Sequence, residues 1–162
     1  MKVLISAVMA LVLSAVVMAQ EGEKGNIELK TVAEVQKEVT NEKGEKEIKL
    51  VPATLVVPGD EVINTTYYTN ISDKQADDIF ITIPVPEHVR YIDGTAGGEN
   101  TQVLFSVDGG MTFDVPGKLM VADAEGNKHK AKPEEYTHIK WVLKKSLKAG
   151  EKGTVSFKTQ IK

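Results

Sequence analysis

Polar and apolar residues alternate along most of the chain after residue 26, which is the pattern of half-buried β-strands. In the first alternating segment the apolar side chains share one parity, and charged or polar side chains occupy the other. The apolar members are Ile27, Leu29, Ala33, Val35 and Val39. The alternation resumes after the turn at residues 41–44, with Ile48 and Leu50. Two such segments around a short glycine-containing turn predict a β-hairpin.

Further alternating segments follow at short spacing, separated by Gly, Pro, Asn and Asp. They lie at about 61–69, 79–83, 89–91, 103–113, 119–121, 139–143 and 155–161. Pro84 and Pro86 end one of them, because proline has no amide proton for a central strand. The pattern therefore predicts an all-β fold, an antiparallel β-sandwich of about eight or nine strands. A closed barrel is the alternative, because alternation alone does not separate the two.

The shared parity also predicts the core. Its expected members are Leu29, Val35, Ile81, Phe105, Trp141, Val155 and Phe157. Trp141 is the largest of them, with about 150–250 Å² of surface to bury and an indole N–H that needs an acceptor.

The first nineteen residues do not alternate, unlike the rest of the chain. A positive start at Lys2 precedes an apolar run from Val3 to Val17, and small residues around Ala19 precede an abrupt change to polar sequence at Gln20. This layout predicts a cleavable signal peptide over 1–19, and the run is shorter than the roughly 20 apolar residues that span a bilayer. We expect one domain over 20–162, exported to the periplasm or the cell exterior, with no membrane span after cleavage.

Composition narrows the functional classes. The chain has no cysteine, so stability must come from packing, strand pairing or partners rather than from disulfides. The formal net charge is −3, and acidic and basic residues are interspersed along the chain. No basic face is apparent, so nucleic-acid binding is disfavoured.

Several segments together resemble the "conserved repeat" domain of unknown function in bacterial and archaeal surface proteins. They are VVPGDEV at 56–62, YTN at 68–70, ITIPVPEHVRYIDGTA at 81–96, FSVDGGMTF at 105–113, YTHIKWVL at 136–143 and KAGEKGTVSFKTQIK at 148–162. The resemblance covers about 50–162 and implies an immunoglobulin-like sandwich without enzymatic activity in an exported envelope or surface protein. The chain departs from the family pattern at Ile83, where an acidic residue is usual, and at Asn64, where an aromatic is frequent.

The segment Ser106–Phe113 fits the Asp-box pattern S-x-D-x-G-x-T-aromatic of β-hairpins. In that pattern the carboxylate, here Asp108, accepts hydrogen bonds from backbone amides of the turn. We therefore interpret the segment as a structural hairpin rather than a ligand-binding loop.

The remaining polar residues give weak site candidates. His88, His129 and His138 have no partners at metal-ligand spacing, and we expect the outward parity of His138 to leave it solvated. Asp73, Asp77 and Asp78 are the best candidates for a Ca²⁺ site, although a solvated loop is the favoured interpretation. No cofactor is expected.

These observations predict a non-catalytic structural or interaction module of the cell envelope or extracellular space, whose partner is a protein or another envelope component. Self-association through the strand at 26–39 is one route, because a long strand can add to the sheet edge of a second copy. The alternative is a module that binds glycan or another envelope ligand, for which Tyr67, Tyr68 and Tyr136 are the aromatic residues expected to face outward. A hydrolase is the least favoured, since no nucleophile motif is present.

Overall fold

The computed structural model describes residues 27–162. The predicted signal peptide lies outside the described residues. The described strands and the short 3-10 helix are β1 (Ile27–Thr40), β2 (Lys46–Pro52), β3 (Glu61–Asn70), β4 (Phe80–Pro84), β5 (Val89–Tyr91), β6 (Gly97–Gly98), β7 (Thr101–Ser106), β8 (Met120–Ala122), β9 (Lys128–Lys130), η1 (Pro133–Glu135), β10 (His138–Leu143) and β11 (Lys152–Ile161).

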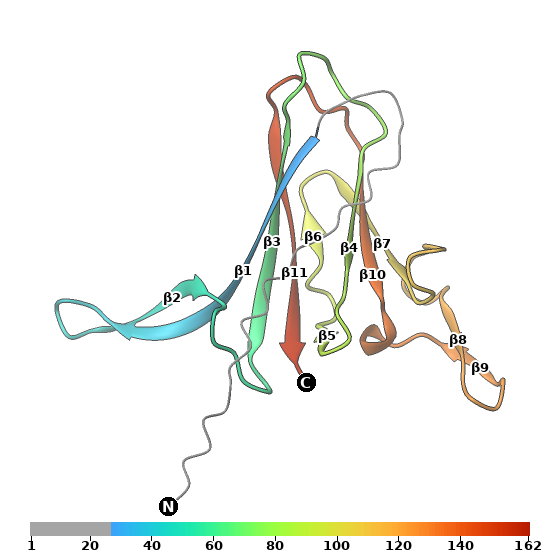
Figure 1. The fold of residues 1–162 in the computed structure, drawn as a ribbon, viewed down its shortest axis with the longest axis horizontal. Coiled ribbons are helices and arrows are strands. Elements are labelled where there is room, and N and C mark those ends of the chain that lie inside the picture. The colour runs from blue at the N-terminus through green and yellow to red at the C-terminus, as the bar shows by residue number, and fades with distance from the viewer. Residues whose placement is uncertain (1–26) are drawn as a thin grey trace, which may run out of the picture.

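The strands form two facing antiparallel sheets and one small hairpin (Figure 1). The large sheet has the order β2-β1-β3-β11-β5, with β6 also paired to β11, and the second sheet has the order β4-β10-β7. Strands β8 and β9 pair only with each other. The all-β prediction is confirmed. No strand pair joins the two facing sheets within residues 27–162, so the arrangement is sandwich-like and not a closed barrel.

The structure has more strands than the alternation predicted. The difference comes from pairings too short or too polar to produce a pattern. Strand β6 consists of two glycines, and β9 is Lys128–His129–Lys130. For residues 111–113 the alternation predicted a strand, but the structure has none there. Only Asp114 forms a bridge, with Phe105.

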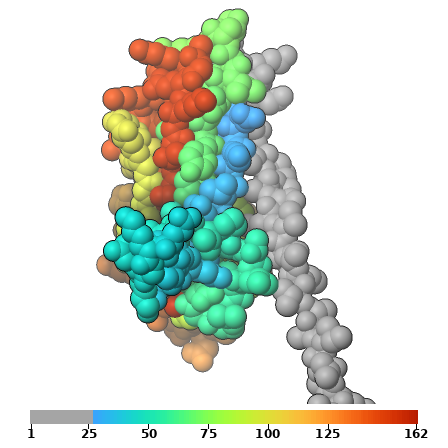
Figure 2. All heavy atoms as spheres, turned by 90° about the vertical axis from the view of Figure 1, so that its left-hand side faces the viewer, coloured from blue at the N-terminus to red at the C-terminus, as the bar shows by residue number. Residues whose placement is uncertain are grey.

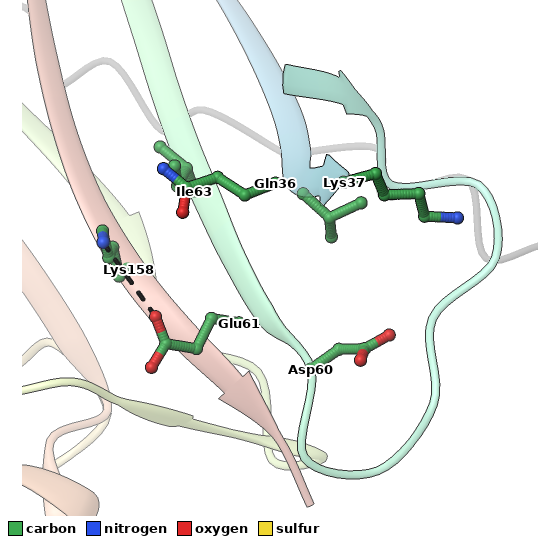
Figure 3. Close-up of a pocket in the computed structure, with 7 residues that line it drawn as sticks. Gln36, Lys37, Asp60, Glu61, Ile63 and Lys158 are labelled. Atoms are coloured by element: carbon green, nitrogen blue, oxygen red, sulfur yellow. Dashed lines mark ion pairs between the residues drawn. The ribbon is translucent and has the colours of Figure 1, made fainter. Parts of the chain in front are cut away.

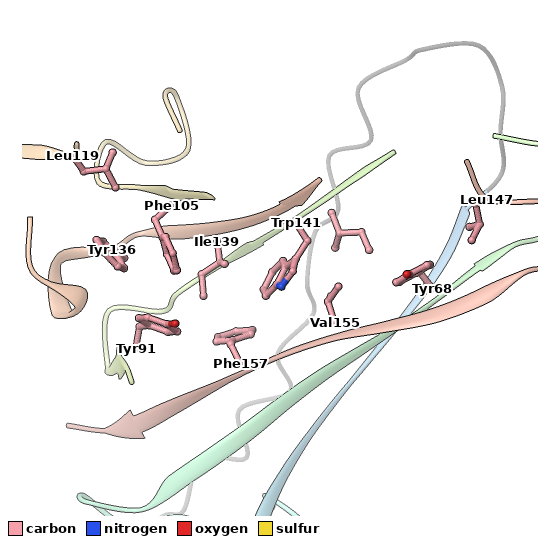
Figure 4. Close-up of a cluster of buried hydrophobic side chains, with 11 residues drawn as sticks. Tyr68, Tyr91, Phe105, Leu119, Tyr136, Ile139, Trp141, Leu147, Val155 and Phe157 are labelled. Carbon is pink, nitrogen blue, oxygen red and sulfur yellow. The ribbon is translucent and has the colours of Figure 1, made fainter. Parts of the chain in front are cut away.

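The core fills the space between the two facing sheets (Figure 4). Its buried members are Tyr68, Ile81, Tyr91, Phe105, Leu119, Tyr136, Ile139, Trp141, Leu147, Val155 and Phe157. The core prediction is confirmed for five of its seven residues, and a sixth, Leu29, is partly buried against the same cluster. Val35 is buried but outside the cluster, because it lies where β1 leaves the sandwich.

Trp141 lies at the centre of this core with no exposed surface. Its indole N–H donates to the carbonyl oxygen of Gly97 at 3.1 Å, and its ring lies 5.8 Å from that of Phe157. The hydrogen bond matters because a buried N–H without an acceptor would cost about 1–3 kcal/mol. Trp141 therefore links β10 in one sheet to β6 on the edge of the other.

The predicted hairpin is present as β1 and β2. Its seven cross-strand pairs run from Glu34 opposite Pro52 to Thr40 opposite Lys46. In the turn, the Asn41 side-chain oxygen accepts hydrogen bonds from the backbone N–H groups of Lys43 and Glu45 at 2.9 and 3.0 Å. Gly44 has a φ of 82°, which a residue without Cβ adopts without strain.

Gly153 in β11 tests how tightly the core is packed. A Cβ at this position would overlap the ring and hydroxyl group of Tyr68. We expect Gly153→Ala to lower the free energy of unfolding by about 1–3 kcal/mol, because the added methyl group forces Tyr68 from its place. Gly97→Ala is the control, since a Cβ at Gly97 meets nothing within 4 Å. Urea denaturation measures both, and equal stability of the two variants would contradict the prediction.

Candidate interaction surface

A two-stranded ribbon, formed by β1 and β2, projects from the sandwich. Strand β1 pairs with β3 only from Ile27 to Val35, and with β2 only from Glu34 to Thr40. Beyond Val35 the two strands β1 and β2 therefore continue without a third. Figure 1 shows this ribbon at the left, and Figure 2, viewed from that side, shows it in cyan in front of the sheets. Isolated two-stranded ribbons are marginally stable in water, so this one gains little from its own contacts.

Exposed apolar side chains gather on this ribbon and on the loop that follows it. Ile48 and Leu50 on β2 are 64% and 51% exposed. In the loop after β2, Leu55 and Val57 are 64% and 61% exposed. Large apolar residues grouped on a projecting element are typical of a surface that contacts a partner.

The strand register explains why the ribbon does not bury these residues. Ile48 lies opposite Glu38 and Leu50 opposite Gln36, whereas Val35 lies opposite Val51 on the other face. Ile48 and Leu50 therefore point to one face of the ribbon, beside polar residues of β1, and Val35 and Val51 point to the other face. The register thus divides the apolar residues of the ribbon between its two faces.

A shallow recess of about 310 Å³ lies at the root of the ribbon (Figure 3). It is lined by Val35, Gln36, Lys37, Asp60, Glu61, Ile63 and Lys158. The Lys158 ammonium lies 4.0 Å from a Glu61 carboxylate oxygen, and the Asp60 carboxylate accepts a hydrogen bond from the Val57 backbone N–H at 2.9 Å. The lining offers charged groups for polar contacts, and none of these seven residues is a serine, cysteine or histidine.

The three tyrosines expected to face outward do not share a surface. Tyr67 is 46% exposed on the outer face of the large sheet, between Lys30 and Thr154. For Tyr68 and Tyr136 the expectation is wrong, because both are core residues with 5% exposure. Burial raises the pKa of each of these two hydroxyl groups. The rings of Tyr136 and Phe105 stack with centroids 4.4 Å apart, which explains the inward position of Tyr136.

The three aspartates proposed for Ca²⁺ are all exposed. Asp77 accepts a hydrogen bond from the Gln75 side chain at 3.1 Å, and hydrogen bonds from Ser146 and Gln75 lower the pKa of its carboxyl group. Asp78 has a φ of 53°. Within residues 27–162, no group of three or more His, Cys, Asp or Glu side chains is placed to hold a metal ion. The carboxylates of Asp73, Asp77 and Asp78 are therefore not brought together as a site.

The histidines lie apart, in three different settings. His88 is exposed, and His129 on β9 pairs with Glu135, whose carboxylate oxygen is 2.9 Å from Nε2. The expectation that His138 is solvated is wrong, because its ring is half-buried beneath the Gly110 backbone. Burial lowers the pKa of His138, and the negative charge of Asp108 partly opposes this effect.

A second arrangement, on the outer face of the β4-β10-β7 sheet, was not found from the sequence. The Lys140 ammonium lies 3.8 Å from the ring centroid of Phe113 and 4.8 Å from that of Phe80. Phe80 is 43% exposed. Such cation–π contacts contribute about 0.5–1 kcal/mol at exposed sites. Because the Lys140 ammonium covers the faces of both rings, we interpret the contact of Lys140 with Phe80 and Phe113 as surface packing.

The role expected of Asp108 in the Asp-box segment is confirmed, whereas the second strand of the expected hairpin is reduced to a single bridge between Phe105 and Asp114. One carboxylate oxygen accepts hydrogen bonds from the backbone N–H groups of Met111 and Thr112 at 3.0 and 2.9 Å, and from the Ser106 hydroxyl at 2.7 Å. The other accepts from the Thr112 hydroxyl at 2.5 Å. These donors, with the Thr112 hydroxyl first, hold the pKa of Asp108 well below its usual range.

Comparisons with known proteins add no relative. No family model, curated protein or solved structure matches the chain. Among the described residues, no helix has the length and apolar character that a membrane span requires.

Asp108→Ala should lower the thermal midpoint by a few degrees at neutral pH, because four donors lose their acceptor. Since the pKa of this carboxyl is depressed in the folded state, its contribution is complete above the ordinary pKa of about 3.9 and is lost as the pH falls toward the depressed value. Calorimetry across pH 2–7 should therefore show the two proteins converging in acid. Asp73→Ala, in an exposed loop, is the control. A difference that stays constant with pH would contradict this account.

Proposed function

We propose that the protein is a non-catalytic structural or interaction module of the cell envelope or extracellular space. The observation that carries this proposal is the projecting β1–β2 ribbon with exposed Ile48, Leu50, Leu55 and Val57. Exposure of these apolar side chains to water is unfavourable. Burying them against a partner would contribute about 25 cal/mol per Å² of apolar area to binding. The leader sequence at 1–19 supports the extracytoplasmic location.

The proposed architecture is an immunoglobulin-like sandwich. Two facing antiparallel sheets around a central buried Trp141 support it, together with the resemblance over about 50–162 to the "conserved repeat" domain of surface proteins. In this proposal strand edges and loops make the contacts to partners, and the facing sheets position them. The ribbon and the loop after it are the corresponding elements here.

A photoreactive phenylalanine analogue in place of Leu55 tests the proposal in the producing cell. We expect light-dependent adducts between the ribbon loop and another envelope component or a second copy. The same analogue at Glu125, in the exposed turn between β8 and β9, is the control and should give none. Intact mass of the recovered protein should show a start near Gln20. Recovery from the cytoplasm with residues 1–19 attached, or no adduct from position 55, would overturn the proposal.

Binding of glycan is the second candidate function, and the exposure of Tyr67 favours it. Its ring lies on an open sheet face beside Lys30 and Thr154, where a sugar could stack on it. If glycan binds there, Tyr67→Ala should reduce binding on a glycan array at least about tenfold. Tyr67→Phe keeps the ring and should bind nearly as well as the natural chain. Unchanged binding in Tyr67→Ala, or none by the natural chain, would remove this function.

A further inference from the structure

The outer edge of β2 is an unpaired strand edge with a defined hydrogen-bonding pattern. Strand β2 is the last in its sheet, so no residue of 27–162 pairs with its far side. The ladder to β1 is bounded by two backbone hydrogen bonds, from Ala53 N–H to the Ala33 oxygen and from Asn41 N–H to the Glu45 oxygen, each 2.9 Å. Hydrogen-bonded and non-bonded pairs alternate in an antiparallel ladder.

This alternation fixes which backbone groups of β2 are free. Ala53 and Glu45 are therefore in hydrogen-bonded pairs, and every second residue between them is too. The backbone N–H and C=O groups of Glu47, Lys49 and Val51 thus point toward β1. The residues between them direct their N–H and C=O groups away from the ribbon, toward solvent. They are Lys46, Ile48 and Leu50. Pro52 comes next in this series and has no N–H to offer.

We propose that β2 pairs antiparallel with β2 of a second copy of this chain, about a two-fold axis at Ile48. The proposal rests on the function proposed above and names the partner of the ribbon. In this register Ile48 lies beside Ile48 of the second copy, and Lys46 lies opposite its Leu50. Glu47 lies opposite Lys49 of the second copy, and the same pair repeats on the other side of the axis. The two ribbons become one four-stranded sheet, and the free N–H and C=O groups of both copies are satisfied.

Charge complementarity selects this axis over its neighbours. Axes at Glu47 or Lys49 would place two identical charges directly opposite at the close, non-hydrogen-bonded spacing, which is destabilising. An axis at Lys46 would bring Glu47 opposite Glu45. An axis at Leu50 would place Pro52, which cannot donate, opposite Ile48. The axis at Ile48 alone puts unlike charges together and keeps all donors.

The other edge of the ribbon is a poorer match. On the β1 side the residues that point away from β2 are Gln36, Glu38 and Thr40, by the same alternation. A two-fold axis at the centre of this edge would place Glu38 beside Glu38 of the second copy. The sequence led us to expect self-association through residues 26–39. We instead propose β2 as the pairing strand, because β3 already pairs with β1 from Ile27 to Val35.

Cysteine cross-linking tests the register, because the chain has no cysteine of its own. Residues that face each other as a hydrogen-bonded pair have Cα atoms about 5.5 Å apart, within the range for a disulfide. Ile48→Cys should therefore form a covalent dimer under mild oxidation. Leu50→Cys is the matched control on the same edge and face, because two Leu50 residues would lie about 13 Å apart along the strands.

Light scattering of the purified protein supplies the second arm. The natural chain should approach twice the monomer mass with rising concentration. Glu47→Lys and Lys49→Glu should each remain monomeric, whereas a mixture of the two should associate, because every pair across the axis is again opposite in charge. Glu125→Lys, far from the ribbon, should associate like the natural chain.

Three results would overturn the proposal: a monomer at every concentration, no restoration in the mixture, or equal cross-linking at positions 48 and 50. Failure here is distinguishable from failure of the proposed function, since an adduct from position 55 to a different protein would leave the interaction module standing without self-pairing.

Discussion

Burial of Trp141 between the two sheets is the interaction on which the rest of the structure depends. The side chain has no exposed surface, and its N–H reaches the Gly97 carbonyl at 3.1 Å. The acceptor lies in the short β6 strand, which pairs with Val155 and Ser156 of β11. Gly98 allows this close approach, because a Cβ at Gly98 would lie 2.8 Å from a Val155 methyl carbon. The buried indole thus connects the two facing sheets.

Side-chain hydrogen bonds to backbone groups hold the connections between strands. Asp108 organises the loop after β7, and Asn70 does the same at the end of β3. The Asn70 amide, fully buried, donates to the Lys74 and Leu147 carbonyl oxygens at 2.7 and 2.9 Å. Buried amides of this kind are satisfied by their neighbours and fix loop geometry. These hydrogen bonds hold the loops that join the sheets, as Asn41 holds the turn of the ribbon, whereas the ribbon strands beyond Val35 have no third strand beside them.

The ribbon differs from the rest because its register splits its apolar residues between two faces. A strand in the sandwich buries one parity against the opposite sheet, so alternation is satisfied within the chain. In β2 the residues Ile48 and Leu50 face the side on which β1 presents Glu38 and Gln36. The apolar parity is then left for contact with something outside the chain. The same mismatch underlies both the interaction surface and the pairing proposed for β2.

The sequence by itself determined where the longer strands lie, the β1–β2 hairpin, the hydrogen-bonding role of Asp108 and most of the core, because alternation and turn chemistry are local properties of the chain. It missed β6 and β9, which are too short or too polar to alternate. It did not determine which strands become neighbours. Tyr67 and Tyr68 show the consequence: adjacent residues necessarily point to opposite faces, and only the sheet packed over β3 decides that Tyr68 is inside. Tyr136 and His138 were misplaced for the same reason, since Phe105 and Gly110 reach them from distant positions. The exposed edge of β2 was likewise decided by the tertiary structure, because its register against β1 sets which backbone groups remain free, and register depends on pairing between strands rather than on either strand alone.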